Sequence, residues 1–325
     1  MIINFVGNFQ TGYVGEQADQ VHLAREMEAL GHIVRRVPQD IWREYVLGSN
    51  EASWQDKLPI QADINIITKW DKFYDGRFIH ELQTLSKAPV FYWCWDYMYD
   101  NGFPEWHEEN VITSDLYLGN DVRCGKYTFT KNTYYFPFDV ADGDLPQFQN
   151  KEKIYNVVFF GSCIPQGDRI AWLTEINKTH PVKIFSWNWQ EWKDKGFDAE
   201  PAIYGIEFNK KVAESKIVLG FSVNPDTWGY WSNRVGKVLL AGGFLLYQYA
   251  PGMELFLRDG MEYFSSIEEA NEKINYYLNN ELEREQVASR GHHIAMDRFT
   301  SRARVEDLVI LAHRFIKTKG KGWMI

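Results

Sequence analysis

The sequence predicts an α/β protein made of two similar halves, each a mostly parallel β-sheet with helices between its strands. Three observations support this fold class. Short apolar runs of strand length alternate with amphipathic segments along most of the chain. A polar, turn-rich stretch at 141–153 separates two such series. Each series begins with an apolar run, a glycine-containing loop and a helix, at 2–6 in the first half and at 154–160 in the second.

The first half contains six candidate strands. The first ends at Gly7, and the glycine loop after it matches neither G-x-G-x-x-G nor a P-loop, so it identifies no dinucleotide or ATP site. The next helix carries Leu23 and Met27 on one face, and Gly31 ends it. The remaining strands are expected at 32–37, 62–68, 89–95, 114–120 and 133–138.

The second half repeats this alternation and then becomes helical. Its helix after the first strand begins near Asp168, and its strands are expected at 154–160, 182–187, 203–208, 216–222 and 244–247. A helix precedes the last of these strands, and a sharp turn and a short helix follow it. From Ser265 or Ser266, either of which serves as an N-cap, three helices run to residue 317.

The elements therefore predict two Rossmann-like domains that face one another, with a helical C-terminal segment. The first domain covers 1–140, the linker 141–153, and the second domain 154–325. The last helix is a candidate to pack back on the first domain.

Composition excludes several classes of protein. With 325 residues, of which 45% are hydrophobic and 24% charged, the chain is neither disordered nor fibrous. A net charge of −9 argues against a protein that coats nucleic acid. The longest apolar run, 238–247, is too short for a membrane span, and the N-terminus does not resemble a signal peptide. Cys94, Cys124 and Cys163 lie far apart, which favours reduced thiols and a cytoplasmic protein.

A candidate anion site lies at the start of the helix expected within 232–241. Asn233, Arg234 and Lys237 occupy its first turns, where free N–H groups and the helix dipole favour negative charge. The turn at 249–252 follows the strand 244–247 at its carboxyl end. Ligands of open α/β sheets bind at such strand ends.

A series of motifs runs through the second half in one order. They are N-R-x-x-K-x-L-L-A-G-G-F-L-L at 233–246, P-G-x-E at 251–254, D-G-x-E-Y-F at 259–264 and E-R-E-x-x-A-x-x-G at 283–291. With them the second half resembles the C-terminal domain of GT-B glycosyltransferases. In particular it resembles the glycosyl transferase group 1 family related to spore maturation protein B. One position departs from that family, because Lys237 stands where a Glu commonly holds the donor ribose.

The resemblance implies a glycosyltransferase of GT-B architecture that uses a nucleoside-diphosphate sugar, with a UDP-sugar favoured, and that needs neither a metal ion nor a cofactor. The donor-binding residues that it implies are Gly161, Ser162, Trp187, Asn233, Arg234, Lys237, Tyr249, Gly252, Met253 and Glu254. Structural alternatives stay open for three of them. Arg234 could be a surface arginine, Trp187 a core tryptophan, and Glu254 a first-turn carboxylate that only stabilises its helix.

The acceptor side is less defined. Asp71 and Asp96 follow predicted strands of the first half, where either could act as the base of an inverting mechanism. Gly12 and Tyr13 are expected to shape the acceptor or sugar pocket. The sequence leaves open whether the anomeric centre inverts and what the oligomeric state is. A glycan, a small molecule or a protein is favoured as the acceptor.

Rival interpretations are a DNA-modifying transferase that acts on a hydroxylated base, and a non-catalytic module that binds nucleotides or glycans. Metal binding has weak support. The D-x-D string at 142–144 lies in a polar linker, and the adjacent side chains of His292 and His293 diverge on a helix.

Overall fold

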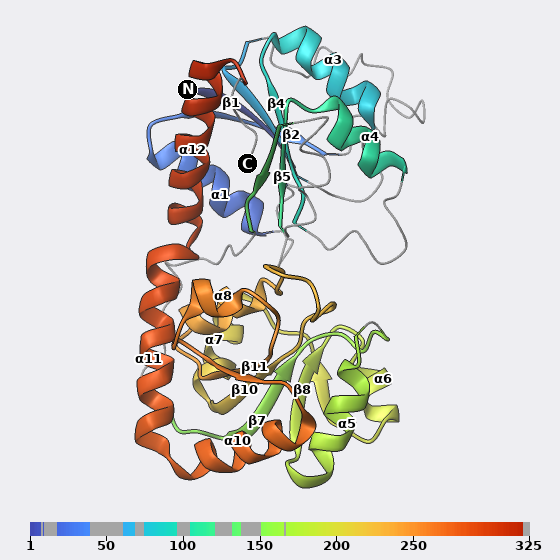
Figure 1. Cartoon of the computed structure of the whole chain (residues 1–325), viewed down its shortest axis with the longest axis vertical. Helices are drawn as coiled ribbons and strands as arrows, with labels where there is room; N and C mark the ends of the chain where they lie inside the picture. The colour runs from blue at the N-terminus through green and yellow to red at the C-terminus, as the bar shows by residue number, and fades with distance from the viewer. Residues whose placement is uncertain are drawn as a thin grey trace. The chain divides into compact units, whose positions relative to one another are not determined.

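The computed structural model describes residues 1–7, 9, 18–39, 61–68, 75–95, 105–120, 132–137, 151–165 and 167–320. The chain divides into two compact units (Figure 1). Unit 1 is Met1–Phe138 together with Arg304–Ile325, and unit 2 is Asp139–Ala303. Within the described ranges, no helix is both long and apolar enough to cross a membrane.

Unit 1 is built on a six-stranded sheet in the order β2-β1-β3-β4-β5-β6, and every pair in it is parallel. The strands are β1 (Ile2–Gly7), β2 (Ile33–Pro38), β3 (Ile64–Thr68), β4 (Val90–Trp93), β5 (Leu116–Gly119) and β6 (Asn132–Tyr135). The central strands β3, β4 and β5 are buried along their whole length. Helices cover both faces of such sheets, which explains why these strands are mostly apolar rather than alternating between apolar and polar residues.

The helices of unit 1 come from both ends of the chain. They are α1 (Ala18–Ala29), α3 (Gly76–Ser86), α4 (Glu105–Thr113) and, from residue 304 onward, α12 (Ser301–Thr318). Phe315 of α12 packs edge-on against Phe91 of β4, with 5.1 Å between ring centroids. The guanidinium group of Arg304 lies 5.1 Å from the ring centroid of Phe136. The C-terminal helix therefore belongs to the core of the N-terminal unit.

Unit 2 contains a second parallel sheet, in the order β12-β11-β10-β7-β8-β9. Its strands are β7 (Tyr155–Phe160), β8 (Val182–Ser186), β9 (Asp198–Pro201), β10 (Ser215–Gly220), β11 (Leu245–Gln248) and β12 (Glu262–Phe264). Its helices are α5 (Arg169–Thr179), α6 (Trp189–Asp194), α7 (Gly205–Ala213), α8 (Arg234–Leu240), α9 (Met253–Leu257), α10 (Ile267–Asn279) and α11 (Glu281–Arg298).

Alternate side chains of β7 enter two separate cores. Val157 and Phe159 pack with residues of α5, α6 and α10, whereas Val158 and Phe160 pack with residues of α7, α8 and α9. The sheet of unit 2 is therefore covered on both faces, as the strongly apolar run at 154–160 predicts.

Two glycines from separate motifs meet where α11 crosses the turn before β12. A Cβ atom on Gly291 would lie 2.1 Å from the carbonyl oxygen of Gly260, and one on Gly260 would lie 2.8 Å from the Cα of Gly291. Only glycine at both positions allows this approach. The two motifs, D-G-x-E-Y-F and E-R-E-x-x-A-x-x-G, thus meet at one packing contact.

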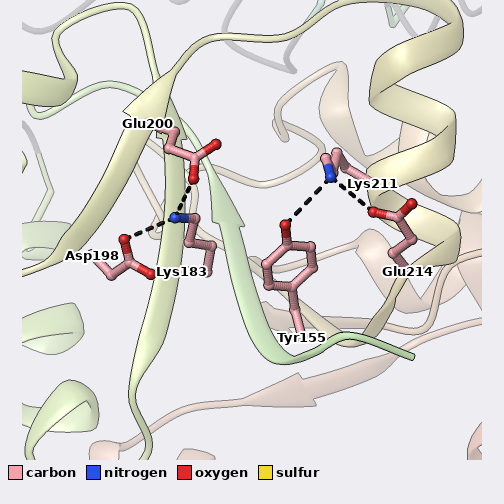
Figure 2. A network of polar contacts seen from close by, with 6 residues as sticks. All are labelled: Tyr155, Lys183, Asp198, Glu200, Lys211 and Glu214. Atoms are coloured by element: carbon pink, nitrogen blue, oxygen red, sulfur yellow. Dashed lines mark hydrogen bonds and ion pairs between the residues drawn. The ribbon is translucent and has the colours of Figure 1, made fainter. Parts of the chain in front are cut away.

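Two partly buried lysines of unit 2 bind carboxylates. Figure 2 shows Nζ of Lys183 on β8 donating to Asp198 at 2.8 Å and to Glu200 at 2.6 Å, both on the edge strand β9. In the same view, Lys211 donates to Glu214 at 2.8 Å. The ion pairs of Lys183 connect β8 to the edge strand β9 through charge-assisted hydrogen bonds, whereas Lys211 pairs with the C-cap residue of its own helix.

One predicted element is wrong. The segment 203–208 was expected to form a strand, but α7 occupies most of it, and the strand β9 lies earlier in the chain. Phe208 and Val212 of α7 are buried four residues apart, which is helical spacing. The short apolar run at 203–208 cannot distinguish the two structures by itself. The N-cap is confirmed at Ser266, whose hydroxyl accepts a hydrogen bond from the amide of Glu269 at 3.1 Å.

Candidate functional site

The order of strands locates a binding crevice in each unit. In unit 2 the chain proceeds from β7 outward to β8 on one side, and β10 lies on the other side of β7. In unit 1 the same reversal falls between β1 and β3. In open α/β sheets, ligands bind outside the carboxyl ends of the strands at this point. We therefore expect the site of unit 2 at the loops after β7 and β10.

Two arginines converge at that crevice. Arg169 is the first residue of α5, which follows the loop from β7, and Arg234 is the first residue of α8, which follows the loop from β10. The side chain of Arg169 is only 3% exposed. Burial, and then the positive charge of Arg234, lowers the pKa of Arg169 from 12.5 to about 10. The two cations therefore destabilise one another while no anion lies between them.

Neither arginine is neutralised within the part of the chain that the structure describes. Nη1 of Arg169 donates to the carbonyl oxygen of Ser162 at 3.3 Å, and its Nε has no hydrogen-bond partner there. Nη1 of Arg234 donates to the hydroxyl of Ser232 at 3.3 Å. No described carboxylate forms an ion pair with either group. Since a buried charge normally has a partner, this arrangement indicates a site for an external anion.

The two loops that carry these arginines are in direct contact. Gly167 has a φ of +57°, and a Cβ atom there would lie 2.7 Å from the carbonyl oxygen of Val223. A small recess between the strand ends is lined by residues of both strands and by Arg234, Ser232 and Tyr247. The hydroxyl of Tyr247 accepts a hydrogen bond from the amide of Ser232 at 3.2 Å. The crevice is thus a fixed feature of the fold of unit 2.

Residues after β8 hold the loop that follows β7. The amide of Cys163 donates to Oδ1 of Asn188 at 2.9 Å, and Nδ2 of Asn188 donates back to the carbonyl of Cys163 at 3.2 Å. The indole of Trp192 donates to the carbonyl of Gly161 at 3.1 Å. Between these anchors Trp187 is 68% exposed, so it is not a core tryptophan.

The Pro-Gly turn after β11 brings four predicted donor-binding residues together. Gly252 adopts a left-handed conformation, with φ of +90°, directly before α9, and Met253 is fully buried beneath it. Partial loss of solvent and then the nearby Glu254 carboxylate raise the pKa of Tyr249. Glu254 is exposed. This turn offers a carboxylate and a phenol at the edge of the sheet.

The structure therefore groups most of the predicted donor residues. Gly161 and Ser162 lie after β7, and Asn233 and Arg234 lie at the start of α8. Lys237 follows one turn into α8 and is half-buried. The predicted residues Gly12, Tyr13, Asp71 and Asp96, and the string at 142–144, lie outside the described residues.

Sequence reasoning missed Arg169, Asn188 and Gln20. Arg169 starts the helix after β7 just as Arg234 starts the helix after β10, and comparing the two helix starts could have found it. Gln20 is buried at the crevice of unit 1, where its Nε2 donates to the hydroxyl of Thr68 at 3.1 Å. A Cβ atom on Gly7 would lie 2.4 Å from Oε1 of Gln20, so a larger residue there would displace the Gln20 side chain.

The site can now be compared with known proteins. Residues 169–310 match the family described as glycosyl transferase-like. Alr3699/HepE from Anabaena, in complex with UDP and glucose, superimposes with a TM-score of 0.66 and 12% identity, covering 97% of this chain and 100% of that one. The fold is that of GT-B glycosyltransferases. The predictions of a GT-B fold and of a glycosyltransferase domain are confirmed.

Two further structures have the same fold. Sucrose-phosphate synthase from Thermosynechococcus elongatus superimposes with a TM-score of 0.71 and 7% identity over 98% of this chain and 99% of that one. An α-glucosyltransferase in complex with UDP and a 13-mer DNA that contains a central A:G mismatch gives a TM-score of 0.65 and 12% identity, over 96% and 98% of the two chains. No curated protein sequence matches this chain.

Proposed function

We propose that the protein is a glycosyltransferase that moves a sugar from a nucleoside-diphosphate sugar to a hydroxyl group of an acceptor. The observation that carries this proposal is the pair Arg169 and Arg234, two cations without a carboxylate partner at the crevice of unit 2. A diphosphate supplies the negative charge that this pair lacks. The match of residues 169–310 to a glycosyl transferase-like family supports the same conclusion. We favour a UDP-sugar, because HepE with this fold binds UDP and glucose.

The two arginines also account for the departure of the leaving group. Negative charge grows on the nucleoside diphosphate as the bond to the sugar breaks, and fixed positive groups stabilise it most strongly where water is excluded. Arg169, at 3% exposure, already occupies such an environment. We therefore propose that guanidinium groups supply the charge stabilisation and that the chemical step needs no metal ion.

On the acceptor side we propose Asp71 as the catalytic base and Asp96 as the second candidate. Asp71 follows β3, which borders the crevice of unit 1, whereas Asp96 follows β4, one strand farther away. We propose that Gly12 and Tyr13, which follow β1 in the sequence, shape the acceptor or sugar pocket. A base in this position serves an inverting mechanism.

For the acceptor we propose a glycan, a small molecule or a protein, since a net charge of −9 disfavours a nucleic acid. A hydroxylated base in DNA is the second candidate, because the α-glucosyltransferase with the same fold holds DNA. We also propose a narrower kinship with the spore maturation protein B group, on the basis of the motifs at 233–291. The spacing of the cysteines leads us to propose a cytoplasmic location.

A thermal-shift screen of UDP, GDP and ADP, each with and without its sugar, tests the proposed function. A ligand at about 100 times its dissociation constant adds roughly 2.7 kcal/mol of stability, so binding is readily seen. We expect UDP and a UDP-sugar to raise the melting temperature. The absence of any shift with every nucleotide would refute the proposal. Hydrolysis of a labelled donor without acceptor is measured in parallel. Tight binding with no hydrolysis at all would instead support a non-catalytic module.

A further inference from the structure

Trp228, which lies in the loop between β10 and α8, covers the backbone of the Pro-Gly turn. A Cβ atom on Gly252 would lie 2.7 Å from Cε2 of the indole and 3.0 Å from both Cδ2 and Nε1. Cδ2 and Nε1 are both bonded to Cε2, and both are slightly farther than Cε2 from the Cβ position, by the same amount. The Cβ position therefore stands above the face of the ring, not at its edge. The indole lies flat against a residue that has no side chain.

The position of this indole is fixed by two loops at once. The amide of Gly229 donates to the carbonyl of Pro251 at 2.8 Å, which connects the loop after β10 to the turn after β11. Phe256 of α9 meets the indole with an interplanar angle of 71° and 6.3 Å between ring centroids. With one face covered in this way, Trp228 still keeps 37% of its surface exposed. A rigid, half-exposed indole is suited to stacking on a flat or puckered ring.

The carboxyl edge of the sheet arranges the candidate contacts in a line. Trp187 follows β8, Arg169 and Arg234 follow β7 and β10, and Trp228 covers the turn after β11. These four strands are consecutive neighbours in the sheet. With about 4.8 Å between neighbours, the distance from β8 to β11 is about 14 Å. An extended nucleoside-diphosphate sugar can reach across these strands with its diphosphate in the middle.

The polar groups decide which end of the donor lies at Trp228. The turn beneath it presents the exposed Glu254 carboxylate and the Tyr249 hydroxyl, which suit the hydroxyl groups of a sugar. Beside Trp187, Asn188 is occupied by the hydroxyl of Ser186 at 2.7 Å and by the backbone of Cys163. The β8 side thus offers mainly an aromatic face, as a nucleobase requires.

We propose that Trp228 is the platform on which the apolar face of the donor's sugar ring stacks, and that Trp187 flanks the nucleobase at the other end. This inference rests on the proposed function and adds a direction to the donor. It makes Trp228 a determinant of the affinity for the sugar but not of the affinity for the nucleotide.

The test compares dissociation constants of a nucleotide and its sugar conjugate by titration calorimetry. UDP is compared with UDP-glucose, UDP-galactose and UDP-N-acetylglucosamine, and the tightest conjugate is kept; if only GDP binds, GDP and GDP-mannose replace them. In Trp228→Ala we expect the affinity for the conjugate to fall about 3- to 10-fold, while the affinity for the nucleotide changes less than twofold. Trp228→Phe keeps a ring and should retain most of the affinity. Trp187→Ala should weaken both ligands equally, on the order of tenfold.

Leu282→Ala, a truncation of a 75% exposed side chain on α11, is the control and should change neither constant. An unchanged ratio of the two affinities in Trp228→Ala would overturn this inference and leave the proposed function intact. An equal loss for nucleotide and conjugate would also overturn it, because Trp228 would then hold the nucleobase. If Trp228→Ala fails to fold, Trp228→Phe and Trp187→Ala replace it as the test. If Trp187→Ala then weakens binding of the sugar conjugate alone, the donor binds in the opposite direction and the inference is wrong. Failure of the wild type to bind any nucleotide would instead refute the proposed function.

Discussion

Replacing Arg169 by Met tests whether unit 2 keeps an unneutralised buried cation in order to bind an anion. The decrease of its pKa from 12.5 to about 10 corresponds to roughly 3 kcal/mol against the charged side chain in the folded protein. Because the unfolded chain binds this proton more tightly, that cost is fully present at neutral pH and disappears only as the pH rises from about 10 to 12.5. The variant loses one hydrogen bond to Ser162, worth about 1 kcal/mol, and the cation–π contact with the Phe159 ring at 5.8 Å, worth about 0.5–1 kcal/mol. We therefore expect the ligand-free variant to be more stable than the wild type by about 1–2 kcal/mol.

The same variant should lose ligand binding. A charge-assisted contact contributes about 1.5–3 kcal/mol, so the affinity for UDP should fall roughly 10- to 100-fold. Urea unfolding with and without UDP measures both effects. The wild type should be the less stable protein without UDP and the more stable one in its presence. A variant that is destabilised without ligand and still stabilised by UDP would show that Arg169 has a structural role.

Arg284 provides the matched control. It is 1% exposed, but its guanidinium group donates to the carbonyl of Tyr277 at 2.7 Å and forms ion pairs with Glu281 and Glu285 at 3.4 and 3.6 Å. Arg284→Met should therefore destabilise the protein, by about 2–3 kcal/mol, and leave UDP binding unchanged. Opposite signs for the two substitutions would distinguish a cation kept for a ligand from a cation kept for the fold.

Three further predictions concern the fold of unit 2. Gly291→Ala places a methyl group 2.1 Å from the Gly260 carbonyl and should lower the free energy of unfolding by about 3 kcal/mol; an unchanged urea midpoint would contradict the close contact. Ser266→Ala removes the N-cap of α10 and should cost about 1 kcal/mol in the same assay, whereas Ser265→Ala should cost little. Burial lowers the pKa of Lys183, but its two carboxylate partners on β9 raise it by a larger amount, so that the net pKa is above 10.5. Its contribution to stability is present below about pH 10.5 and is lost as the pH rises through the folded pKa, so wild type should lose more stability than Lys183→Met as the pH rises above 10.5.

Most helices and strands follow from local pattern. The runs at 154–160 and 62–68 are mostly apolar because the strands they form are covered on both faces. The N-cap at Ser266 depends on neighbours within three residues, so the sequence predicts it directly. The segment 203–208 is the exception, because a short apolar run fits a strand as well as the first turn of a helix.

The sequence also predicted much of the proposed donor side through its motifs. Arg234 and the Pro-Gly turn stand in an order of residues that resembles a known family, and the structure places both at the carboxyl edge of one sheet. The motifs do not identify the catalytic base or the acceptor, because these depend on groups from separate loops.

Sequence by itself determined the α/β class and the two series of strands, and it predicted an anion site at the start of α8. Only the tertiary structure decided that Arg169 lies beside Arg234, 65 positions later in the chain, and that Trp228 lies on Gly252. The physical reason is that a parallel sheet brings the carboxyl ends of distant strands to one edge. Local periodicity does not specify which strands become neighbours, and the strand order determines which residues meet at the proposed site.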